Sequence, residues 1–125
     1  MNILFVGIGG FFGSGIRYLV TRLFDVLMPV FPFGTLICNV VAGFLIGLII
    51  GIERQTGVLP ARLKLFLTTG LLGGLSTFST FSLETMVAIE NGKLFIAAGN
   101  IILNVSLCLV GVFLGLTLSK VLVIK

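Results

Sequence analysis

The sequence predicts an all-α integral membrane protein with four helices in a single domain. Of its 125 residues, 58% are hydrophobic and 10% are charged, whereas soluble domains carry roughly 25% charged residues. The mean hydropathy is +1.29. The charged residues also divide the chain into four long uncharged runs. Because so little polar surface is available to face water, lipid must surround most of the chain.

A membrane helix needs about 20 apolar residues, and the length of each uncharged run is close to that number. The predicted spans cover residues 2–23, 33–52, 63–89 and 94–120. Residues that break helices or form turns separate the spans, namely Pro29 and Pro32, Gly57 and Pro60, and the pair Asn91-Gly92. The links are too short for a soluble domain.

Four spans place both chain ends on one side of the membrane. The basic residues expected on that side are Arg54, Arg62, Lys64, Lys120 and Lys125, and those expected on the other side are Arg17, Arg22 and Lys93. Cytoplasmic loops normally carry a clear excess of Lys and Arg. The small difference here predicts a poorly specified, dual orientation.

Glycines recur at four-residue spacing, in the sets Gly9 and Gly13, Gly43, Gly47 and Gly51, and Gly111 and Gly115. This spacing puts small residues on one helix face and allows helix backbones to approach closely. Four short helices enclose little interior, so we expect some of these faces to meet a second subunit.

Several function classes are excluded by composition. The eight basic residues are scattered, whereas a nucleic-acid-binding protein needs a concentrated basic face. The chain has no histidine, no nucleophile–base pair and no cluster of metal ligands, so we do not expect an enzyme. The two cysteines, Cys38 and Cys108, fall inside apolar runs and are interpreted as packing residues.

The third predicted span is the most polar, although it carries no charge. Gly70, Gly73 and Gly74 weaken a helix, and hydroxyl residues crowd the stretch 76–82. Ser and Thr side chains compete for backbone hydrogen bonds and can open a helix. Opened backbone at membrane depth persists only where protein, water or an ion satisfies it, and it often marks an ion site. A continuous helix with hydroxyls bonded to their own carbonyls is the alternative.

Phe78 and Phe81 are three residues apart and therefore share one face of a helix. An aromatic ring has a positive edge, which can attract a small anion without a fixed charge. Ser79 and Thr80 would then donate hydrogen bonds along the same path. The alternative is that both rings are ordinary core residues.

Polar groups also lie in the other spans. Asn39 is costly in lipid unless bonded, so it either makes an interhelical hydrogen bond or donates to an anion. Thr35 lies four residues earlier on the same face, and Asn100 and Asn104 form a polar stripe on the fourth span. We expect Arg17 to reach the membrane interface; drawing anions into a vestibule is its alternative role.

Two stretches together resemble the Fluc (CrcB) family of fluoride channels. They are Gly34-Thr35-Leu36-x-x-Asn39 in the second span and the run from Gly73 to Ser82 followed by x-Glu84 in the third. The resemblance covers the whole chain. It implies an antiparallel, dual-topology homodimer in the bacterial cytoplasmic (inner) membrane, with two pores, a third helix broken at residues 73–77 and a structural sodium ion at the dimer centre.

The resemblance also implies roles for individual residues. Phe78 and Phe81 match the rings whose edges meet fluoride, and Asn39 matches the amide that supports them. Thr35, Ser79 and Thr80 match hydroxyl residues along the polar path. Gly73 and Ser76 match positions whose backbone carbonyls hold the sodium ion. This chain departs from the pattern at Ser76, where some relatives have Thr, and at Asn100, where relatives can carry Tyr.

A fluoride pore is physically reasonable for this set of residues. Fluoride is small and strongly hydrated, so a channel must replace its hydration with donors that still release it. Amide, hydroxyl and ring-edge groups meet that need better than a buried Lys or Arg. The alternative is a small dimeric four-helix exporter coupling drugs to protons, but that mechanism needs a carboxylate inside the membrane, and only Glu84 comes close.

Overall fold

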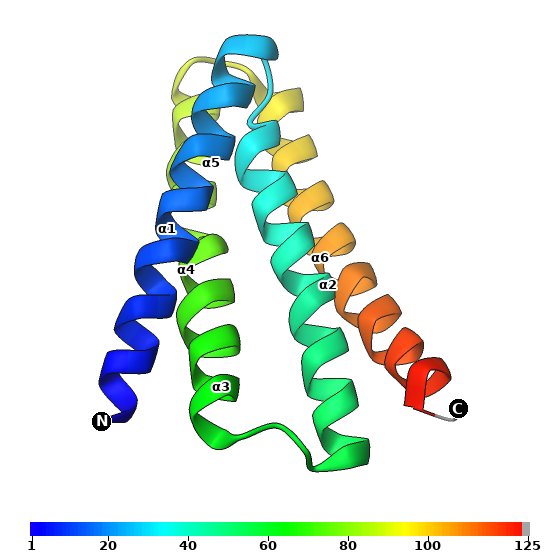
Figure 1. The fold of residues 1–125 in the computed structure, drawn as a ribbon. Coiled ribbons are helices and arrows are strands. Elements are labelled where there is room, and N and C mark those ends of the chain that lie inside the picture. Colours follow the sequence, from blue (N-terminus) through cyan, green and yellow to red (C-terminus); the bar gives the residue numbers. More distant parts are fainter. Residues whose placement is uncertain (124–125) are drawn as a thin grey trace.

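The computed structural model describes residues 1–123 and is helical throughout, with no strand among them. Three helices are long: α1 (Asn2–Leu27), α2 (Phe33–Thr56) and α6 (Leu94–Val123). The chain between α2 and α6 is built from shorter pieces, which are α3 (Ala61–Leu65), the π-helix η1 (Phe66–Leu72), α4 (Gly73–Leu75) and α5 (Phe78–Glu90). These pieces run beside the long helices from one end of the bundle to the other (Figure 1).

The helices end where the sequence places its turn residues. Gly57 adopts left-handed backbone with φ of 62° after α2, and Gly92 has φ of 70° after α5. Proline precedes both α2 and α3, at Pro32 and Pro60. The helices extend past the spans expected from charge alone, because capping residues end a helix, whereas charges only mark where lipid gives way to water.

Three helices, α1, α2 and α6, are each long and apolar enough to cross a membrane. The third crossing expected from the sequence is divided among α3, η1, α4 and α5, so no single helix there reaches the required length. The N-terminus, the α2–α3 link and the last turn of α6 lie at one end of the bundle (Figure 1). Lys125, which contributed to the predicted charge bias, lies outside the described residues.

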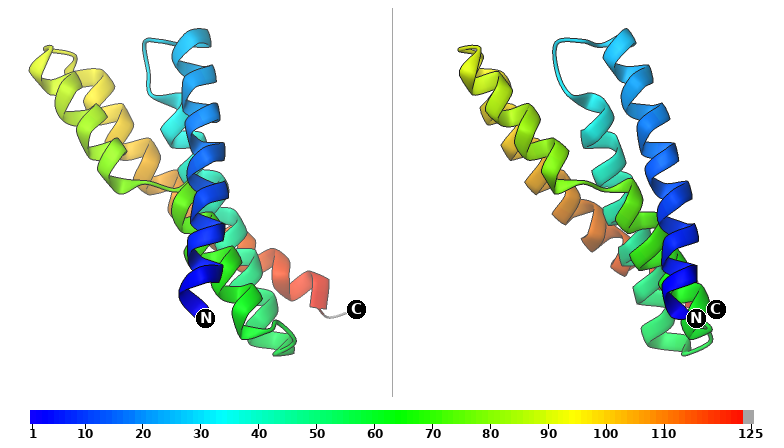
Figure 2. Two further views of the ribbon diagram at one scale, coloured as in Figure 1. Left: turned by 60° about the vertical axis from the view of Figure 1, so that its left-hand side comes forward. Right: turned by 90° about the vertical axis from the view of Figure 1, so that its left-hand side faces the viewer.

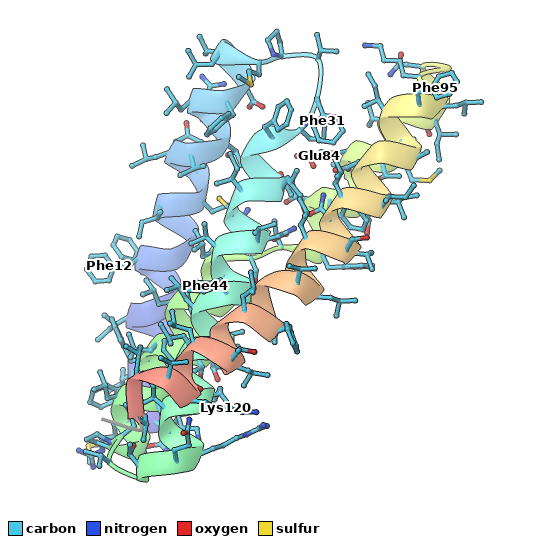
Figure 3. All side chains as sticks on the ribbon, turned by 90° about the vertical axis from the view of Figure 1, so that its right-hand side faces the viewer. Phe12, Phe31, Phe44, Glu84, Phe95 and Lys120 are labelled. Atoms are coloured by element: carbon cyan, nitrogen blue, oxygen red, sulfur yellow. The ribbon has the colours of Figure 1, made fainter. Side chains whose placement is uncertain are left out.

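The distribution of polarity is opposite to that of a soluble protein. Large apolar side chains cover the outside, and Phe12 and Phe95 point away from the bundle (Figure 3). Phe95 is 96% exposed. The buried set includes the polar residues Thr35, Thr85, Asn100, Asn104 and Ser119. This pattern fits a protein whose surrounding solvent is lipid.

The third segment changes its packing partner along its length. Its first half, η1 and α4, packs on α1, and its second half, α5, packs on α6. Figure 2 shows the α5 end diverging from α1 together with the first half of α6. The long helices α2 and α6 pack together along most of their length.

Glycines make these close contacts possible inside the chain. A Cβ on Gly13 would lie 2.0 Å from the Leu71 carbonyl oxygen, and one on Gly9 would lie 2.4 Å from that of Phe66. Between α2 and α6, a Cβ on Gly47 would lie 2.4 Å from the Val112 carbonyl oxygen. Gly115 is similarly tight, since its Cβ would lie 2.2 Å from Phe44 O.

The expectation that some of these glycine faces meet a second subunit stays a prediction, and within the chain the glycines already have partners. Each of the glycine sets packs against a neighbouring helix of the same chain. Spacing predicts a close helix contact, but it does not specify which helix makes it.

Candidate functional site

The helical backbone is interrupted between α4 and α5. Ser76 has φ −79° and ψ 151°, and Thr77 has φ −153° and ψ 119°, both extended conformations. The interruption is narrower than residues 73–77, because Gly73–Leu75 remain helical. The reason lies in Ser76, whose backbone N–H and side-chain hydroxyl both donate to the Leu72 carbonyl, at 3.0 and 2.9 Å, and so close the last helical turn.

Thr77 begins the second half of the segment as an N-cap. Its Oγ1 accepts a hydrogen bond from the backbone N–H of Thr80 at 3.2 Å. The same oxygen lies 3.1 Å from Ser79 Oγ and 3.2 Å from Thr80 Oγ1. An N-cap of this kind satisfies one of the N–H groups that a helix start leaves without a partner. The hydroxyl-rich sequence therefore starts α5 as well as ending α4.

Asn39 of α2 holds the extended backbone from the side. Its Oδ1 accepts from the Thr77 N–H at 2.7 Å, and its Nδ2 donates to the Thr77 carbonyl at 3.3 Å. The same Nδ2 donates to Oδ1 of Asn104 at 2.9 Å. Two roles were considered for Asn39, an interhelical hydrogen bond and donation to an anion. The structure contains the interhelical hydrogen bonds. They satisfy backbone groups that lipid could not.

Among the carbonyls that the interruption leaves without their usual helical donors are those of Gly73 and Ser76. In a continuous helix the Gly73 oxygen would bond to the N–H of Thr77, but that N–H donates to Asn39. The Ser76 oxygen would bond to the N–H of Thr80, but that N–H donates to Thr77 Oγ1. Two backbone oxygens of this kind are suitable ligands for a hard cation such as sodium. The residues predicted for a sodium site therefore fit that group.

Arg17 takes a position that the sequence did not predict. Its Nε donates to the Gly74 carbonyl at 3.0 Å, and the side chain is half-buried. The helix α1 continues ten residues beyond Arg17 to Leu27, and a reach to the membrane interface stays a prediction. Within the chain, the guanidinium satisfies a carbonyl beside the interruption.

A cavity of about 430 Å³ opens beside the interruption between α2, the third segment and α6. Five of its lining residues were predicted site residues: Asn39, Gly73, Ser76, Phe78 and Phe81. Asn104 and Thr77 also line it. The predicted residues Thr35, Ser79 and Thr80 do not.

The two phenylalanines differ sharply in environment. Their ring centroids are 5.3 Å apart and the ring planes are inclined by 54°. Phe81 is 8% exposed and Phe78 is 78% exposed. One ring is thus held inside the chain, and the other projects from it at the mouth of the cavity.

Thr35 lies in the first turn of α2, one helical turn before Asn39. Its side chain is 1% exposed, and its hydroxyl donates to Oε1 of Glu84 at 2.5 Å. A second cavity of about 210 Å³ lies at this end, and Asp25, Glu84 and Lys93 are among its lining residues. Figure 3 shows Glu84 close to the start of α2, near Phe31. Thr35 therefore belongs to a separate polar position from the phenylalanine pair.

The polar stripe predicted on the fourth span is a hydrogen-bonded chain. Asn104 Nδ2 donates to Oδ1 of Asn100 at 2.8 Å, and Asn100 Nδ2 donates to Oγ1 of Thr85 at 3.0 Å. Thr85 in turn donates to the Phe81 carbonyl at 2.8 Å. The part played by Thr85 was missed, although its spacing of four residues from Phe81 could have indicated it.

Comparison with known proteins places the chain in a family. The family described as "CrcB-like protein, Camphor Resistance (CrcB)" matches residues 4–116. This chain belongs to the CrcB-like family. The resemblance inferred from the motifs on α2 and the third segment is thereby confirmed.

Relatives match over nearly the full chain. A protein of Clostridium novyi (strain NT) is 44% identical over 119 residues, which are 94% of this chain and 93% of the relative. One of Ruminiclostridium cellulolyticum is 45% identical over 121 residues, 96% and 93% of the two chains. One of Shewanella sp. (strain ANA-3) is 44% identical over 115 residues, 91% and 92%. All three relatives are named "Fluoride-specific ion channel FluC".

Proposed function

We propose that this chain is a fluoride channel that conducts the ion passively across the bacterial cytoplasmic membrane. The observation that carries the proposal is the extended backbone at Ser76 and Thr77, in the middle of a helical membrane segment. Membrane proteins open a helix in this way where an ion or substrate is bound. The choice of fluoride is supported by the names of the relatives.

The interruption creates two helix ends of opposite polarity. The start of α5 presents backbone N–H groups and the positive end of its dipole, which favour an anion. The end of α4 presents the carbonyl oxygens of Gly73 and Ser76, which favour a cation. An uncharged segment thereby gains distinct positions for both signs of charge without a titratable group.

The start of α5 also carries the groups proposed to meet the anion. Phe78 and Phe81 present ring edges along one face, and their positive edges attract a small anion weakly enough to release it. Ser79 and Thr80 add hydroxyl donors beside them, and both residues lie within hydrogen-bonding distance of Thr77 Oγ1. Thr35 and Glu84 would form the separate polar position that this path reaches farther along the bundle.

A second copy of the chain completes the proposed channel. Phe78 and the cavity beside it open outward, and lipid could not satisfy the polar groups that line this opening. An antiparallel homodimer of dual topology would cover both openings and form two pores. Basic residues are only slightly more numerous on the membrane side that holds both chain ends, which is compatible with insertion in either direction.

The carbonyls of Gly73 and Ser76 would hold a structural sodium ion at the centre of this dimer. When bound, the ion would supply positive charge that offsets the electronegative oxygens freed by the interruption. The two oxygens come from backbone, so a side-chain substitution at Ser76 is expected to disturb the site less than a change in helix geometry.

The direct test is fluoride efflux from liposomes that contain the purified protein, followed with a fluoride-selective electrode. Efflux well above that of empty liposomes, with little chloride efflux, is expected. Absence of fluoride efflux, or equal chloride efflux, would overturn the proposal. Proton-coupled cation export, the alternative expected from four short helices, would instead show as drug uptake driven by a pH gradient.

The aromatic contribution is tested by Phe81→Ile and Phe78→Ile. Each removes a ring edge but keeps an apolar side chain, so fluoride efflux should fall at least about tenfold, equivalent to about 1.4 kcal/mol. Phe95→Ile, on an outward-facing and 96% exposed ring, is the matched control and should leave efflux unchanged. Full efflux in both pore variants would remove the ring-edge mechanism.

A further inference from the structure

We propose that Asn104 and Asn100 of α6 are positioning residues that orient the amide of Asn39. This inference rests on the proposed channel function for its consequence, although its geometry is independent of the ion. It assigns a role to Asn100 and Asn104, a pair on the buried face of α6 that packs against α2 and α5.

The hydrogen bonds run in one direction through three side-chain amides. Asn39 donates to Asn104 at 2.9 Å, and Asn104 donates to Asn100 at 2.8 Å. Asn100 donates to Thr85 at 3.0 Å, and the Thr85 hydroxyl donates a hydrogen bond to the Phe81 carbonyl at 2.8 Å. We call this chain of four side chains the amide relay.

One backbone group determines the direction of the whole relay. The oxygen and nitrogen of an asparagine amide are nearly the same in shape, so a partner of known polarity is needed to distinguish them. The N–H of Thr77 can only donate, and it meets Asn39 at 2.7 Å, so that atom of Asn39 must be the oxygen. The nitrogen of Asn39 then faces Asn104, and each following amide is oriented in turn.

The relay uses every amide hydrogen that these residues possess. The two on Asn39 go to Thr77 O and Asn104, and the two on Asn104 go to the backbone and side-chain oxygens of Asn100. Those of Asn100 reach Thr85 Oγ1 at 3.0 Å and Phe81 O at 3.5 Å. No amide hydrogen remains for an anion in this arrangement. Asn39 therefore supports the pore through Thr77.

Burial makes the orientation costly to change. Asn100 is 1% exposed and Asn104 is 4% exposed. Turning either amide over would place two oxygens or two N–H groups against each other at buried positions, leaving unsatisfied groups that cost about 1–3 kcal/mol each. The relay thus connects Thr77, at the start of α5, to the buried face of α6. Asn100 on that face also donates to the Phe81 carbonyl of α5.

The functional test compares three substitutions on α6. Asn104→Leu interrupts the relay at its centre and should lower fluoride efflux per folded protein at least tenfold. Asn100→Leu leaves Asn39 and Asn104 bonded to each other and should have a smaller effect. Ser106→Leu, at an exposed position of the same helix, should leave efflux unchanged. If Asn104→Leu does not fold, Asn104→Asp replaces it, since it keeps the shape and the acceptor for Asn39 but loses the donor to Asn100.

A role limited to holding helices together makes a different prediction. It requires efflux to fall only in proportion to folded protein, measured by size-exclusion chromatography of the same samples. That result, or full efflux from the folded Asn104 variant, would overturn the positioning role.

A second measurement tests the relay without fluoride. With ¹⁵N-labelled asparagine, the side-chain NH₂ signals of Asn39, Asn100 and Asn104 should exchange with deuterium far more slowly than that of exposed Asn91. The Asn104→Leu variant should accelerate exchange at Asn39. Equally rapid exchange at Asn39 and Asn91 in the unsubstituted protein would overturn the relay, whereas absence of fluoride efflux with slow exchange would overturn only the channel function.

Discussion

The two halves of the third segment are held mainly by different kinds of contact. The first half, η1 and α4, packs on α1 through glycines that bring backbones into contact, as at Gly13 and Leu71. The second half, α5, is joined to α6 through side chains, as at Thr85 and Asn100. The first half has one polar side chain of α1 on its backbone, Arg17 on the Gly74 carbonyl, whereas α5 is joined to α6 through hydrogen bonds between side chains of both helices.

The difference explains where the interruption lies. Ser76 and Thr77 occupy the point where the segment leaves α1 and joins α6 (Figure 2). A straight helix could not follow both partners, which diverge along the bundle. Asn39 supplies hydrogen bonds to Thr77 at this junction, so the change of partner costs little in unsatisfied backbone. All the groups proposed to meet the anion lie on the second side of the junction or on helices that pack against it.

The largest effect is expected from adding a methyl group in the glycine half. Gly13→Ala would place Cβ 2.0 Å from the Leu71 oxygen, so α1 and η1 must separate. We expect loss of most folded protein, seen as loss of the monodisperse peak in size-exclusion chromatography. Gly15→Ala is the control, because its Cβ meets nothing within 4 Å and alanine favours a helix by about 1 kcal/mol. Equal behaviour of the two variants would contradict the backbone contact.

At the junction, Asn39→Leu should abolish most fluoride efflux. It leaves both backbone groups of Thr77 and the Oδ1 of Asn104 without their partner. Each unsatisfied buried group costs about 1–3 kcal/mol, so a fall in efflux of at least about tenfold is expected. The measurement is efflux per folded protein, with Val41→Leu, an exposed position on the same helix, as control. Efflux within twofold of the unsubstituted protein would show that the junction does not need Asn39.

A smaller change is expected where α5 begins. Thr77→Val removes the oxygen that accepts from Thr80 N–H, and loss of an N-cap costs about 1 kcal/mol. Thr77→Ser keeps the oxygen and should retain the stability of the parent protein. Thermal unfolding in detergent, with both variants measured side by side, separates the cap from the methyl group. A lower midpoint for Ser than for Val would argue that packing of the methyl group matters more.

The smallest effect is expected at the outer end of the glycine half. Lys64 of α3 and Glu53 of α2 form an ion pair at 3.2 Å, with 40% and 21% of their side chains exposed. Such partly exposed pairs contribute about 0–1 kcal/mol, so Lys64→Met should shift thermal unfolding only slightly. The shift should shrink further at high salt. A large, salt-independent loss would indicate that this end is held by charge rather than by glycine packing.

Much of the site could be anticipated from local sequence. The glycine and hydroxyl content of the third segment indicated weakened helix, and Ser76 and Thr77 do adopt extended backbone. The polar stripe of Asn100 and Asn104 followed from their four-residue spacing. The position of Arg17 did not follow, because it depends on how far α1 extends and on which carbonyl lies opposite.

The amino-acid sequence by itself determined that this protein has long apolar helices separated by proline and glycine turns, and that one segment carries hydroxyls in place of charge. These are local properties, set by composition and by the intrinsic preferences of each residue type. Tertiary structure alone decided the partners: Gly13 against Leu71, Arg17 on Gly74, and Asn39 between Thr77 and Asn104. Contacts across 38 to 65 positions of the chain depend on which helix faces meet, and helical periodicity defines a face without naming its neighbour.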